Sequence, residues 1–469
     1  MMKQSILICG GRIIDAAQGI DQVGNLFVNN GKIVELTSGT NYINKHKSET
    51  ILKIDAKGLV VTPGFIDIHC HLREPGYSDK ETIITGTKAA AAGGFTTICC
   101  MPNTNPPLDN HSIVKWLINK TKNEGVVNVL PVACITKGRE GLELTEMAEL
   151  AKTGVIAFSD DGNGVSNSKL MRSALEYSAQ LDLPIMEHCE DKVLSAGGVI
   201  NEGLVSEKLG VAGIPAAAEE VMVARNLILA HLTGGKIHIS HVSTQGSVIM
   251  IRIAKERGIK VTAEATPHNL ALTQNNVFKN MSDNKNVNTT ELQYKEQNLF
   301  TKFGTLYNTN AKMYPPLRTE DDKDCLVEAL NDGTIDAIAT DHAPHTLIDK
   351  EGDLSSAAFG VSGFETAFGC SMGLVHTGKI DLIRLISKLT YEPAMIIGKT
   401  NELGFLRKGR SANITIFDPM QEWIVDSKLF ISKGKNTPFD GFKFRGRVLA
   451  TIVNGDIAYI DNILKPHIN

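Results

Sequence analysis

The chain has 469 residues, of which 42% are hydrophobic and 21% charged, and its formal net charge is -4. This composition is typical of a globular protein with a large core. There is no Lys/Arg cluster of the kind that predicts nucleic-acid binding, and no apolar run approaches the roughly 20 residues of a membrane-spanning helix. The first residues lack the apolar core of a signal peptide and the eight cysteines form no C-x-x-C pair, so we expect reduced thiols and a cytoplasmic location.

Residues 1–63 have the pattern of short strands separated by turns. Asn30-Gly31 stands between two apolar runs, which is a strong signal for a β-hairpin. Residues 405–469 show the same pattern of short apolar runs and turns. We therefore predict that the two ends of the chain pair into one small β-sandwich, which flanks a central domain of residues 64–404.

The central domain alternates apolar strands with helical stretches, a pattern that predicts parallel strands connected by helices. Eight strands in this span favour an α/β fold of the TIM type, a closed (β/α)8 barrel. The alternative is an open doubly wound sheet, but no G-x-G-x-x-G follows the first strand. The predicted strands are 64–69, 95–101, 127–134, 155–159, 184–187, 236–240, 259–265 and 335–340, and the clearest predicted helices are 79–92, 168–180, 216–232 and 247–257.

An Asn-rich insert interrupts the barrel at residues 273–311. Nine of its 39 residues are Asn and few are apolar, so it buries too little surface to offset the entropy of ordering it. We predict a long, mobile loop. Because it follows the seventh strand, it emerges on the face where barrel enzymes keep their active sites. It is a lid, a surface for a partner, or an insertion without a function.

Polar side chains follow several of the predicted strands at their C-terminal ends. His69 and His71 end the first strand, and alternate residues of a strand share a face, so their imidazoles point the same way. Imidazoles and carboxylates are zinc ligands, and two ions that share a carboxylate lie about 3.5–4 Å apart. The candidates for holding one or two Zn²⁺ ions at this rim are His69, His71, Asp160 or Asp161, His188, His241 and Asp341.

Here the sequence resembles a known family. The run GFIDIHCHLREPG at 64–76 resembles the dihydroorotase signature of the amidohydrolase superfamily. The resemblance covers the chain from end to end apart from the insert, and it is strongest to the bacterial class I enzymes. Further matching motifs are 101–104 (MPNT), 160–162 (DDG), 187–191 (EHCED), 240–244 (SHVST), 266–268 (TPH), 315–318 (PPLR) and 339–345 (ATDHAPH).

The resemblance implies a function and a role for each matching residue. The implied reaction is the reversible, zinc-dependent hydrolysis of dihydroorotate to N-carbamoyl-L-aspartate in pyrimidine synthesis, by a homo-oligomer that can associate with aspartate transcarbamoylase. The implied metal ligands are His69, His71, Asp161, His188, His241 and Asp341, of which Asp341 also moves the proton, and the implied substrate contacts are Arg73, Asn103, His345 and the backbone of Phe359-Gly360.

Two positions depart from patterns known in these relatives. Hydantoinases carry a carbamylated lysine at the bridging position, where this chain has Asp161, as many class I dihydroorotases do. The family usually has an Asn before the PPLR motif, where this chain has Tyr314, which is bulkier. The alternatives to an active dihydroorotase are therefore an allantoinase or hydantoinase, against which Arg73 and Asn103 argue, and a catalytically impaired homologue that serves as a scaffold for a transcarbamoylase.

The Tyr314→Asn variant tests the second departure. We expect it to lower the Michaelis constant for dihydroorotate or to leave it unchanged, because it restores the residue that the resemblance implies. Steady-state kinetics on the purified variant measure this. A large loss of activity would show instead that Tyr314 is an adapted contact of this chain.

Overall fold

The computed structural model describes residues 4–38, 51–278 and 307–468, so most of the predicted loop of the Asn-rich insert, 279–306, lies outside the described residues. All eight predicted barrel strands form, and they line up in sequence order in one parallel sheet. A doubly wound sheet reverses its strand order, so the barrel prediction is confirmed over that alternative. The strands are β6 (Phe65–Cys70), β7 (Phe95–Cys100), β8 (Asn128–Ala133), β9 (Ala157–Phe158), β10 (Ile185–Glu187), β13 (Ile237–Ile239), β14 (Val261–Ala265) and β15 (Ala337–Ile338).

The barrel closes between its first strand and the segment after its last strand. The His71 amide donates to the carbonyl oxygen of His342 at 2.9 Å. Deeper in the seam, the buried carboxylate of Asp67 accepts from the Thr340 amide at 2.8 Å and from the Thr340 hydroxyl at 2.6 Å. These bonds hold β6, which carries His69 and His71, against the segment that carries Asp341.

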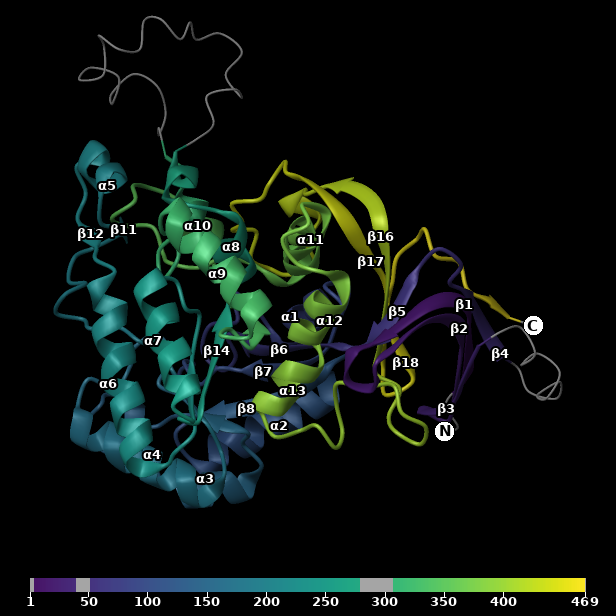
Figure 1. Ribbon diagram of the computed structural model, residues 1–469, viewed down its shortest axis with the longest axis horizontal. Helices are drawn as coiled ribbons and strands as arrows, with labels where there is room; N and C mark the ends of the chain where they lie inside the picture. The colour runs from purple at the N-terminus through teal and green to yellow at the C-terminus, as the bar shows by residue number, and fades with distance from the viewer. Residues whose placement is uncertain (1–3, 39–50, 279–306, 469) are drawn as a thin grey trace, which may run out of the picture.

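Helices cover the outside of the barrel (Figure 1). The four helices predicted most clearly from sequence are confirmed, with ends that differ by a few residues. Many begin with a capping side chain, as at Asn167, whose Oδ1 accepts from the amides of Lys169 and Leu170. The helices are α1 (Ile83–Ala92), α2 (His111–Glu124), α3 (Met147–Thr153), α4 (Ser168–Leu181), α6 (Ala217–Thr233), α7 (Gln245–Glu256), α9 (Glu320–Asp332), α11 (Phe364–His376), α12 (Leu382–Leu389) and α13 (Tyr391–Ile396).

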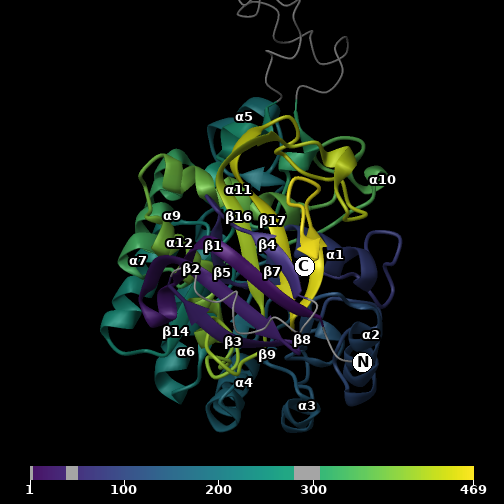
Figure 2. The same cartoon turned by 90° about the vertical axis from the view of Figure 1, so that its right-hand side faces the viewer.

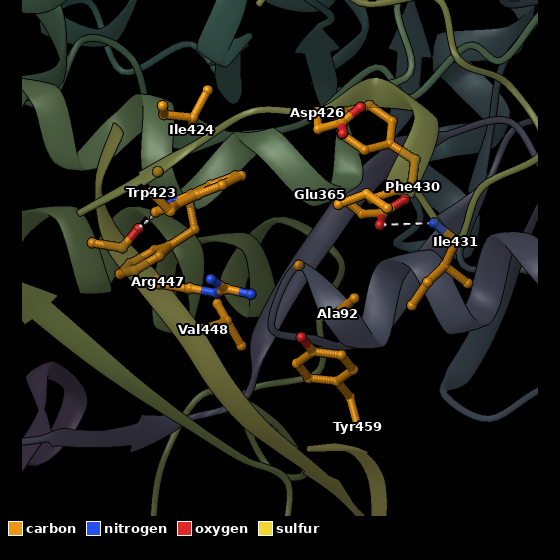
Figure 3. Close-up of a pocket in the computed structure, with 15 residues that line it drawn as sticks. Ala92, Glu365, Trp423, Ile424, Asp426, Phe430, Ile431, Arg447, Val448 and Tyr459 are labelled. Carbon is orange, nitrogen blue, oxygen red and sulfur yellow. Dashed lines mark hydrogen bonds between the residues drawn. The ribbon is translucent and has the colours of Figure 1, made fainter. Parts of the chain in front are cut away.

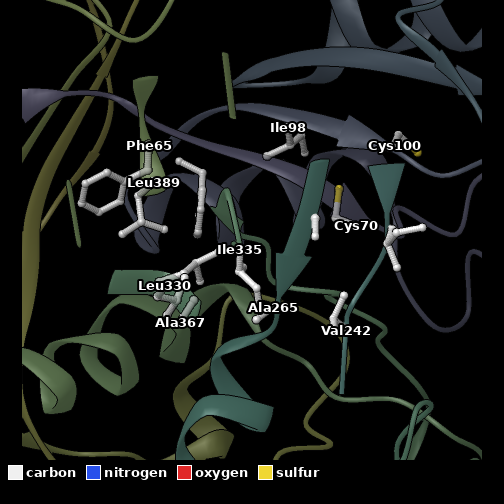
Figure 4. Packing of buried hydrophobic residues seen from close by; sticks show 14 of the residues in the cluster. Phe65, Cys70, Ile98, Cys100, Val242, Ala265, Leu330, Ile335, Ala367 and Leu389 are labelled. Atoms are coloured by element: carbon white, nitrogen blue, oxygen red, sulfur yellow. The ribbon is translucent and has the colours of Figure 1, made fainter. Parts of the chain in front are cut away.

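The main core lies between the barrel strands and these helices (Figure 4). Phe65 of β6 is fully buried there, and its ring lies 5.2 Å from that of Phe368 on α11 and 6.3 Å from that of Phe417. Each such side chain contributes roughly 1.5–3 kcal/mol by leaving water. Because Phe417 belongs to the C-terminal segment, the same aromatic cluster fixes the barrel to the terminal sheet.

The two ends of the chain form one continuous nine-stranded sheet beside the barrel (Figures 1 and 2). The predicted pairing of the ends is present: β5 and β16 run antiparallel, with Thr62 opposite Thr415. The predicted turn at Asn30-Gly31 also forms, with φ of 48° and 79°. The strands are β1 (Ser5–Asp15), β2 (Ile20–Asn29), β3 (Lys32–Thr37), β4 (Ile51–Asp55), β5 (Val60–Pro63), β16 (Ile414–Ile424), β17 (Lys443–Val453), β18 (Asp456–Ile460) and β19 (His467–Ile468).

Short elements surround the C-terminal ends of the barrel strands. Phe278 and Tyr307 form an antiparallel bridge at the described base of the Asn-rich insert. Within the described parts of the chain, no helix has the length and apolarity to cross a membrane. The short elements are β11 (Ile200–Asn201), β12 (Gly213–Ile214), α5 (Leu204–Leu209), α8 (Pro267–Ala271), α10 (Leu347–Lys350) and the 3-10 turns at Gln274–Val277 and Thr309–Ala311.

We predict that Asp67→Ala destabilises the fold by about 3 kcal/mol, because it leaves the buried amide and hydroxyl of Thr340 without an acceptor. Thr340→Val is the matched control: it keeps the amide bond to Asp67 but removes the hydroxyl, which donates to Asp67 and accepts from the His342 amide at 3.0 Å, and it should cost about 1–2 kcal/mol. Chemical denaturation followed by circular dichroism measures both. Equal unfolding midpoints for Asp67→Ala and the parent protein would contradict the role of this seam.

Candidate metal centre and substrate cavity

The two histidines of β6 present their Nε2 atoms to the same point above the barrel. His69 Nδ1 lies 2.6 Å from Glu264 Oε1, and His71 Nδ1 lies 2.8 Å from Asn103 Oδ1. The amide oxygen can only accept, and the carboxylate of Glu264 is ionised, so both Nδ1 atoms carry the proton. Each imidazole therefore offers the lone pair of its Nε2 to a metal ion.

Asp161 lies between two pairs of imidazoles. Its Oδ1 is 3.3 Å from His69 Nε2, and its Oδ2 is 3.7 Å from His71 Nε2. On the other side, His188 Nδ1 and His241 Nε2 each lie 3.8 Å from Asp161 Oδ1. The structure thus contains two buried groups of three potential ligands, and Asp161 is common to both.

The donor set and spacing fit a pair of metal ions. His188 Nδ1 and His241 Nε2 lie 2.9 Å apart, and His188 Nε2 lies 3.4 Å from Glu190, which leaves Nδ1 for coordination. Ligand atoms on one tetrahedral zinc ion, with bonds of about 2.0–2.1 Å, lie about 3.3 Å apart. His69 Nε2 is buried without a hydrogen-bond partner among the described residues. A cation between these groups satisfies that atom.

The protonation states of the group suit metal binding. Burial raises the pKa of Asp161, but the imidazoles of His69 and His241 outweigh burial and hold the pKa well below its ordinary value. Burial lowers the pKa of His69, but the carboxylates of Glu264 and Asp161 outweigh it and raise the pKa well above its ordinary value. The acids are therefore ionised at neutral pH, and a metal ion competes with a proton for His69.

Asp341 stands at the edge of the first group. Its Oδ1 lies 3.0 Å from His71 Nε2 and 3.7 Å from His69 Nε2. Three residues of this rim have left-handed backbone conformations, with φ of 62° at Arg73, 35° at His241 and 44° at Asp341. Such conformations cost about 1–3 kcal/mol each and persist where the surrounding structure demands them. Here they aim side chains from different strands at one point.

Asp160, the alternative to Asp161 at this position, faces away from the metal centre. Its Oδ1 accepts from the amides of Ile135 at 2.8 Å and Thr136 at 3.0 Å, and its Oδ2 accepts from the Thr136 hydroxyl. Its carboxylate therefore holds the loop after β8. The geometry favours Asp161 as the bridging ligand.

A cavity of about 230 Å³ opens over this centre. Every residue that the sequence predicted for the site lines it, except His69, which is fully buried beneath. The Arg73 Nε donates to the Pro344 carbonyl oxygen at 3.2 Å, and one of its terminal nitrogens lies 3.4 Å from His345 Nε2. The cavity therefore brings a half-buried guanidinium to face the imidazoles and carboxylates of the rim.

His345 is a neutral imidazole between two cations. Burial lowers its pKa to about 3, and the charges of Arg73 and Lys80 act in the same direction. Its Nδ1 lies 3.3 Å from Lys80 Nζ. Only one ring nitrogen of a neutral imidazole carries a proton, so the other accepts from one of these cations and helps to hold it in place.

Asn103 was predicted to contact the substrate, and in this structure its amide contacts two candidate ligands. Its Oδ1 accepts from His71, and its Nδ2 donates to Asp161 Oδ2 at 3.1 Å. The side chain also lines the cavity. Asn103 thus orients two candidate metal ligands, and its contact with the substrate stays a prediction.

Tyr314 forms part of the cavity wall. Its ring stacks on His188 with centroids 5.2 Å apart, and it packs against Phe359 at 4.8 Å. The Lys312 ammonium lies 4.2 Å from the Phe359 ring centroid. Tyr314, which replaces the family Asn, is therefore packed against His188, a candidate metal ligand, and Phe359, a candidate substrate contact.

The Phe359-Gly360 segment is held from behind by Lys350. This ammonium is buried and donates to the carbonyl oxygens of Lys312, Ala358 and Gly360 at 3.1, 2.7 and 3.2 Å. The Gly360 amide already donates to the Lys312 carbonyl oxygen at 3.1 Å. A substrate contact from this amide would have to replace that bond, and the predicted backbone contact stays untested.

Sequence reasoning missed Glu264, which the structure places at the centre of the support for the ligands. Its Oε1 accepts from His69 and from the His241 amide, and its Oε2 lies 3.1 Å from His238 Nε2. The available signal was a single acid within the apolar run of β14. A single acid in an apolar run does not reveal which residue it contacts, and its partner His69 is 195 positions away in the chain.

Solved structures with the same fold are hydantoinases. The L-hydantoinase (dihydropyrimidinase) from Arthrobacter aurescens gives a TM-score of 0.80 at 23% identity and covers 97% of this chain and 96% of its own. The dihydropyrimidinase from Brevibacillus agri NCHU1002 gives a TM-score of 0.78 at 21% identity, and the alignment covers 99% of this chain and 97% of that protein. At these identities the likeness establishes the fold alone. The fold and the site together define the class: a (β/α)8 barrel with two histidine–carboxylate groups at its rim that could hold metal ions.

Relatives in sequence identify the family within that class. A family model described as dihydro-orotase-like matches residues 58–247. The dihydroorotase of Thermoanaerobacter sp. is 47% identical over 455 residues, which are 97% of this chain and 97% of the relative. The dihydroorotase of Syntrophus aciditrophicus is 46% identical over 454 residues, 97% and 99% of the two chains. The chain belongs to the dihydroorotase family, which consists of hydrolases of cyclic amides.

We predict that Glu264→Gln weakens zinc binding by about 10–100-fold, because the amide cannot supply the charge that polarises His69. Titration of zinc into the metal-free protein, followed by calorimetry, measures the affinity. Glu187→Gln is the control: Glu187 is equally buried on β10, two strands from β14, but its Oε1 accepts from the Val165 amide at 2.8 Å. Equal losses in the two variants would show that Glu264 supports the fold rather than the metal.

Proposed function

We propose that this dihydroorotase holds zinc at its rim and catalyses the reversible hydrolysis of L-dihydroorotate to N-carbamoyl-L-aspartate. The observation that carries the proposal is the position of Asp161 between two imidazole pairs, beneath the cavity that also presents Arg73. His69 and His71 would hold one ion, and His188 and His241 the other. When bound, zinc supplies the Lewis acidity that activates water and polarises the amide carbonyl.

Asp341 is suited to transfer the proton. Burial raises its pKa, but its hydrogen bond with His71 and the charges of nearby imidazoles outweigh burial, so the pKa lies below its ordinary value. In the hydrolytic direction a water oxygen adds to the ring carbonyl carbon, and the ring C–N bond breaks. Asp341 takes the proton that the water loses and delivers it to the leaving ring nitrogen, so the protons balance. Ring closure uses the same residue in reverse.

Arg73 is suited to recognise the carboxylate of the substrate. A guanidinium offers a planar fork of donors that matches a carboxylate with two parallel hydrogen bonds. Its backbone-anchored Nε leaves the terminal nitrogens toward the cavity and His345. Hydantoin and allantoin have no carboxylate for this fork. The pairing of Arg73 with the metal groups therefore favours dihydroorotate over these neutral rings.

The location and partners belong to the same proposal. All eight cysteines are free and seven are buried, which supports a reducing compartment such as the cytoplasm, because disulfides form and persist in oxidising ones. The homo-oligomer and the association with aspartate transcarbamoylase remain predictions from the family resemblance. Binding studies with the full chain test both.

Asp341→Asn should lower kcat for dihydroorotate by about 10²–10⁴-fold and keep its zinc, because it removes the proton acceptor and leaves the two groups around Asp161 intact. Zinc stoichiometry and dihydroorotate turnover, measured on the same sample, check this. A rate near that of the parent protein would exclude the acid–base role. A parent protein with neither zinc nor turnover would favour the scaffold alternative.

Arg73→Met should raise the Michaelis constant for dihydroorotate about 100-fold, because a bidentate, charge-assisted contact contributes about 1.5–3 kcal/mol. The Michaelis constant of Arg73→Lys should lie between those of the parent protein and Arg73→Met, because lysine keeps the positive charge but lacks the planar fork of donors. Turnover of dihydroorotate, hydantoin and allantoin is compared for all three proteins. A parent protein that turns over hydantoin or allantoin faster than dihydroorotate would overturn the proposed substrate.

A further inference from the structure

A second cavity lies between the barrel and the terminal sheet, where α1 and α11 meet β16, β17 and β18. Its volume is about 230 Å³, and it shares no lining residue with the cavity over the metal centre. Small-molecule sites occur preferentially at the junction of two structural units. The proposed reaction gives this cavity no role.

Aromatic side chains form its walls. Trp423 and Phe430 lie on opposite sides of the cavity, and Tyr459 lies below them (Figure 3). The Trp423 indole is fixed, because its Nε1 donates to the Gly446 carbonyl oxygen at 3.0 Å and its ring meets the edge of Phe444 at 5.6 Å. A fixed indole offers a rigid apolar surface to a ligand, and the Arg447 guanidinium already lies 5.9 Å from its ring centroid.

A buried acid faces the same space. One carboxyl oxygen of Glu365 accepts from the Ile431 amide at 2.9 Å (Figure 3). The other accepts from the Ser432 amide at 3.0 Å. Each oxygen keeps a second lone pair for another donor. Burial raises the pKa of Glu365 to about 7, so a cation placed beside it would favour the ionised form.

The other charged groups of the cavity leave it acidic. Arg447 also lines the cavity, but its guanidinium is paired with Asp461 at 2.7 Å. Asp426, at the mouth, adds a further carboxylate. The Lys435 ammonium, which lies near Glu365, does not line the cavity and donates to the carbonyl oxygens of Phe430 and Ser432.

We propose that this cavity binds a small organic ammonium ion with an aromatic or other apolar substituent, and that its occupancy acts on the catalytic rim. The ammonium lies at Glu365 and the apolar part lies against Trp423 and Phe430. The mouth is open to such a ligand and is itself apolar, with Ile424 and Leu429 exposed by 67% and 78%.

A short series of contacts connects this cavity to the metal centre. The Ser432 hydroxyl donates to Glu81 Oε2, and the same oxygen lies 3.4 Å from His342 Nε2. His342 follows Asp341 in the chain, and its carbonyl oxygen accepts from the His71 amide. A ligand that draws Glu365 away from the amides of Ile431 and Ser432 therefore shifts Ser432. The contact of Ser432 with Glu81 passes this shift to His342, which is next to Asp341 in the chain and is bonded to His71.

Binding is tested by the fluorescence of Trp423. The chain has two tryptophans, and Trp116→Phe on α2 leaves Trp423 as the only indole. Phenethylamine is titrated into this variant of the full chain, with 3-phenylpropionate as the probe of opposite charge. We expect a saturable change with phenethylamine and an affinity at least tenfold weaker for 3-phenylpropionate. Equal affinities, or no saturable change with phenethylamine, would overturn the proposal.

Two variants locate the response. Glu365→Gln should weaken phenethylamine binding at least tenfold, and Ala92→Leu, which fills the cavity without removing a polar contact, should abolish it. Unchanged affinity in Ala92→Leu would place the probe elsewhere and overturn the site. Trp423 fluorescence that changes with protein concentration but not with phenethylamine would show that a second copy of the chain covers this face. That result would also overturn the proposal.

Coupling is tested by turnover. Saturating phenethylamine should change kcat for dihydroorotate at least twofold, with the same half-saturating concentration as the fluorescence change, and Ala92→Leu should abolish the change. Unaltered turnover at saturation would overturn the coupling. The binding test reads fluorescence alone, so its result is independent of the proposed hydrolysis.

Discussion

The contact on which the site depends is that of one carboxylate with four imidazoles. Asp161 is buried beside His69, His71, His188 and His241, which lie in or directly after three different strands. Four imidazoles and a carboxylate buried at short range attract a compensating positive charge, which a metal ion or a proton on His69 can supply. The other contacts of the rim follow from this requirement. Glu264, Asn103 and Glu190 each bind the far nitrogen of an imidazole, so the near nitrogen stays available to a metal ion.

The barrel holds the candidate metal ligands on rigid elements and carries the predicted substrate contacts on loops. The first strand and the segment after the last strand are joined by Asp67, Thr340 and His342, which fixes the imidazoles of β6 against Asp341. The predicted substrate contacts lie on loops, at Arg73 and at the Phe359-Gly360 segment that Lys350 holds from behind. The candidate metal ligands lie in or directly after barrel strands, which are the more rigid elements.

The sequence predicted the architecture well because strand ends carry a strong pattern. All eight barrel strands and the pairing of the chain ends were foreseen, but β9 and β15 are only two residues long where five and six were predicted. Apolar runs record burial, whereas ladder pairing also depends on the tilt of neighbouring strands. Side-chain contacts between residues far apart in the chain could not be predicted from the sequence. Neither the bond from His69 to Glu264 nor the stacking of Tyr314 on His188 leaves a periodic pattern in the sequence. The motifs brought the candidate residues together, and only coordinates showed that Asn103 faces the ligands.

The union of the chain ends has a consequence for biosynthesis. The Thr62 hydroxyl meets the Thr415 carbonyl oxygen across 353 positions, and β5 pairs with β16 over its whole length. The ribosome therefore completes the barrel while the N-terminal strands still lack their neighbours, with an unpaired edge of the kind that invites aggregation. Closing so long a loop is slow and entropically costly. The pairing of β5 with β16 can therefore form only after residue 414 has been synthesised, and a nascent chain that stalls before it exposes the unpaired edge of β5.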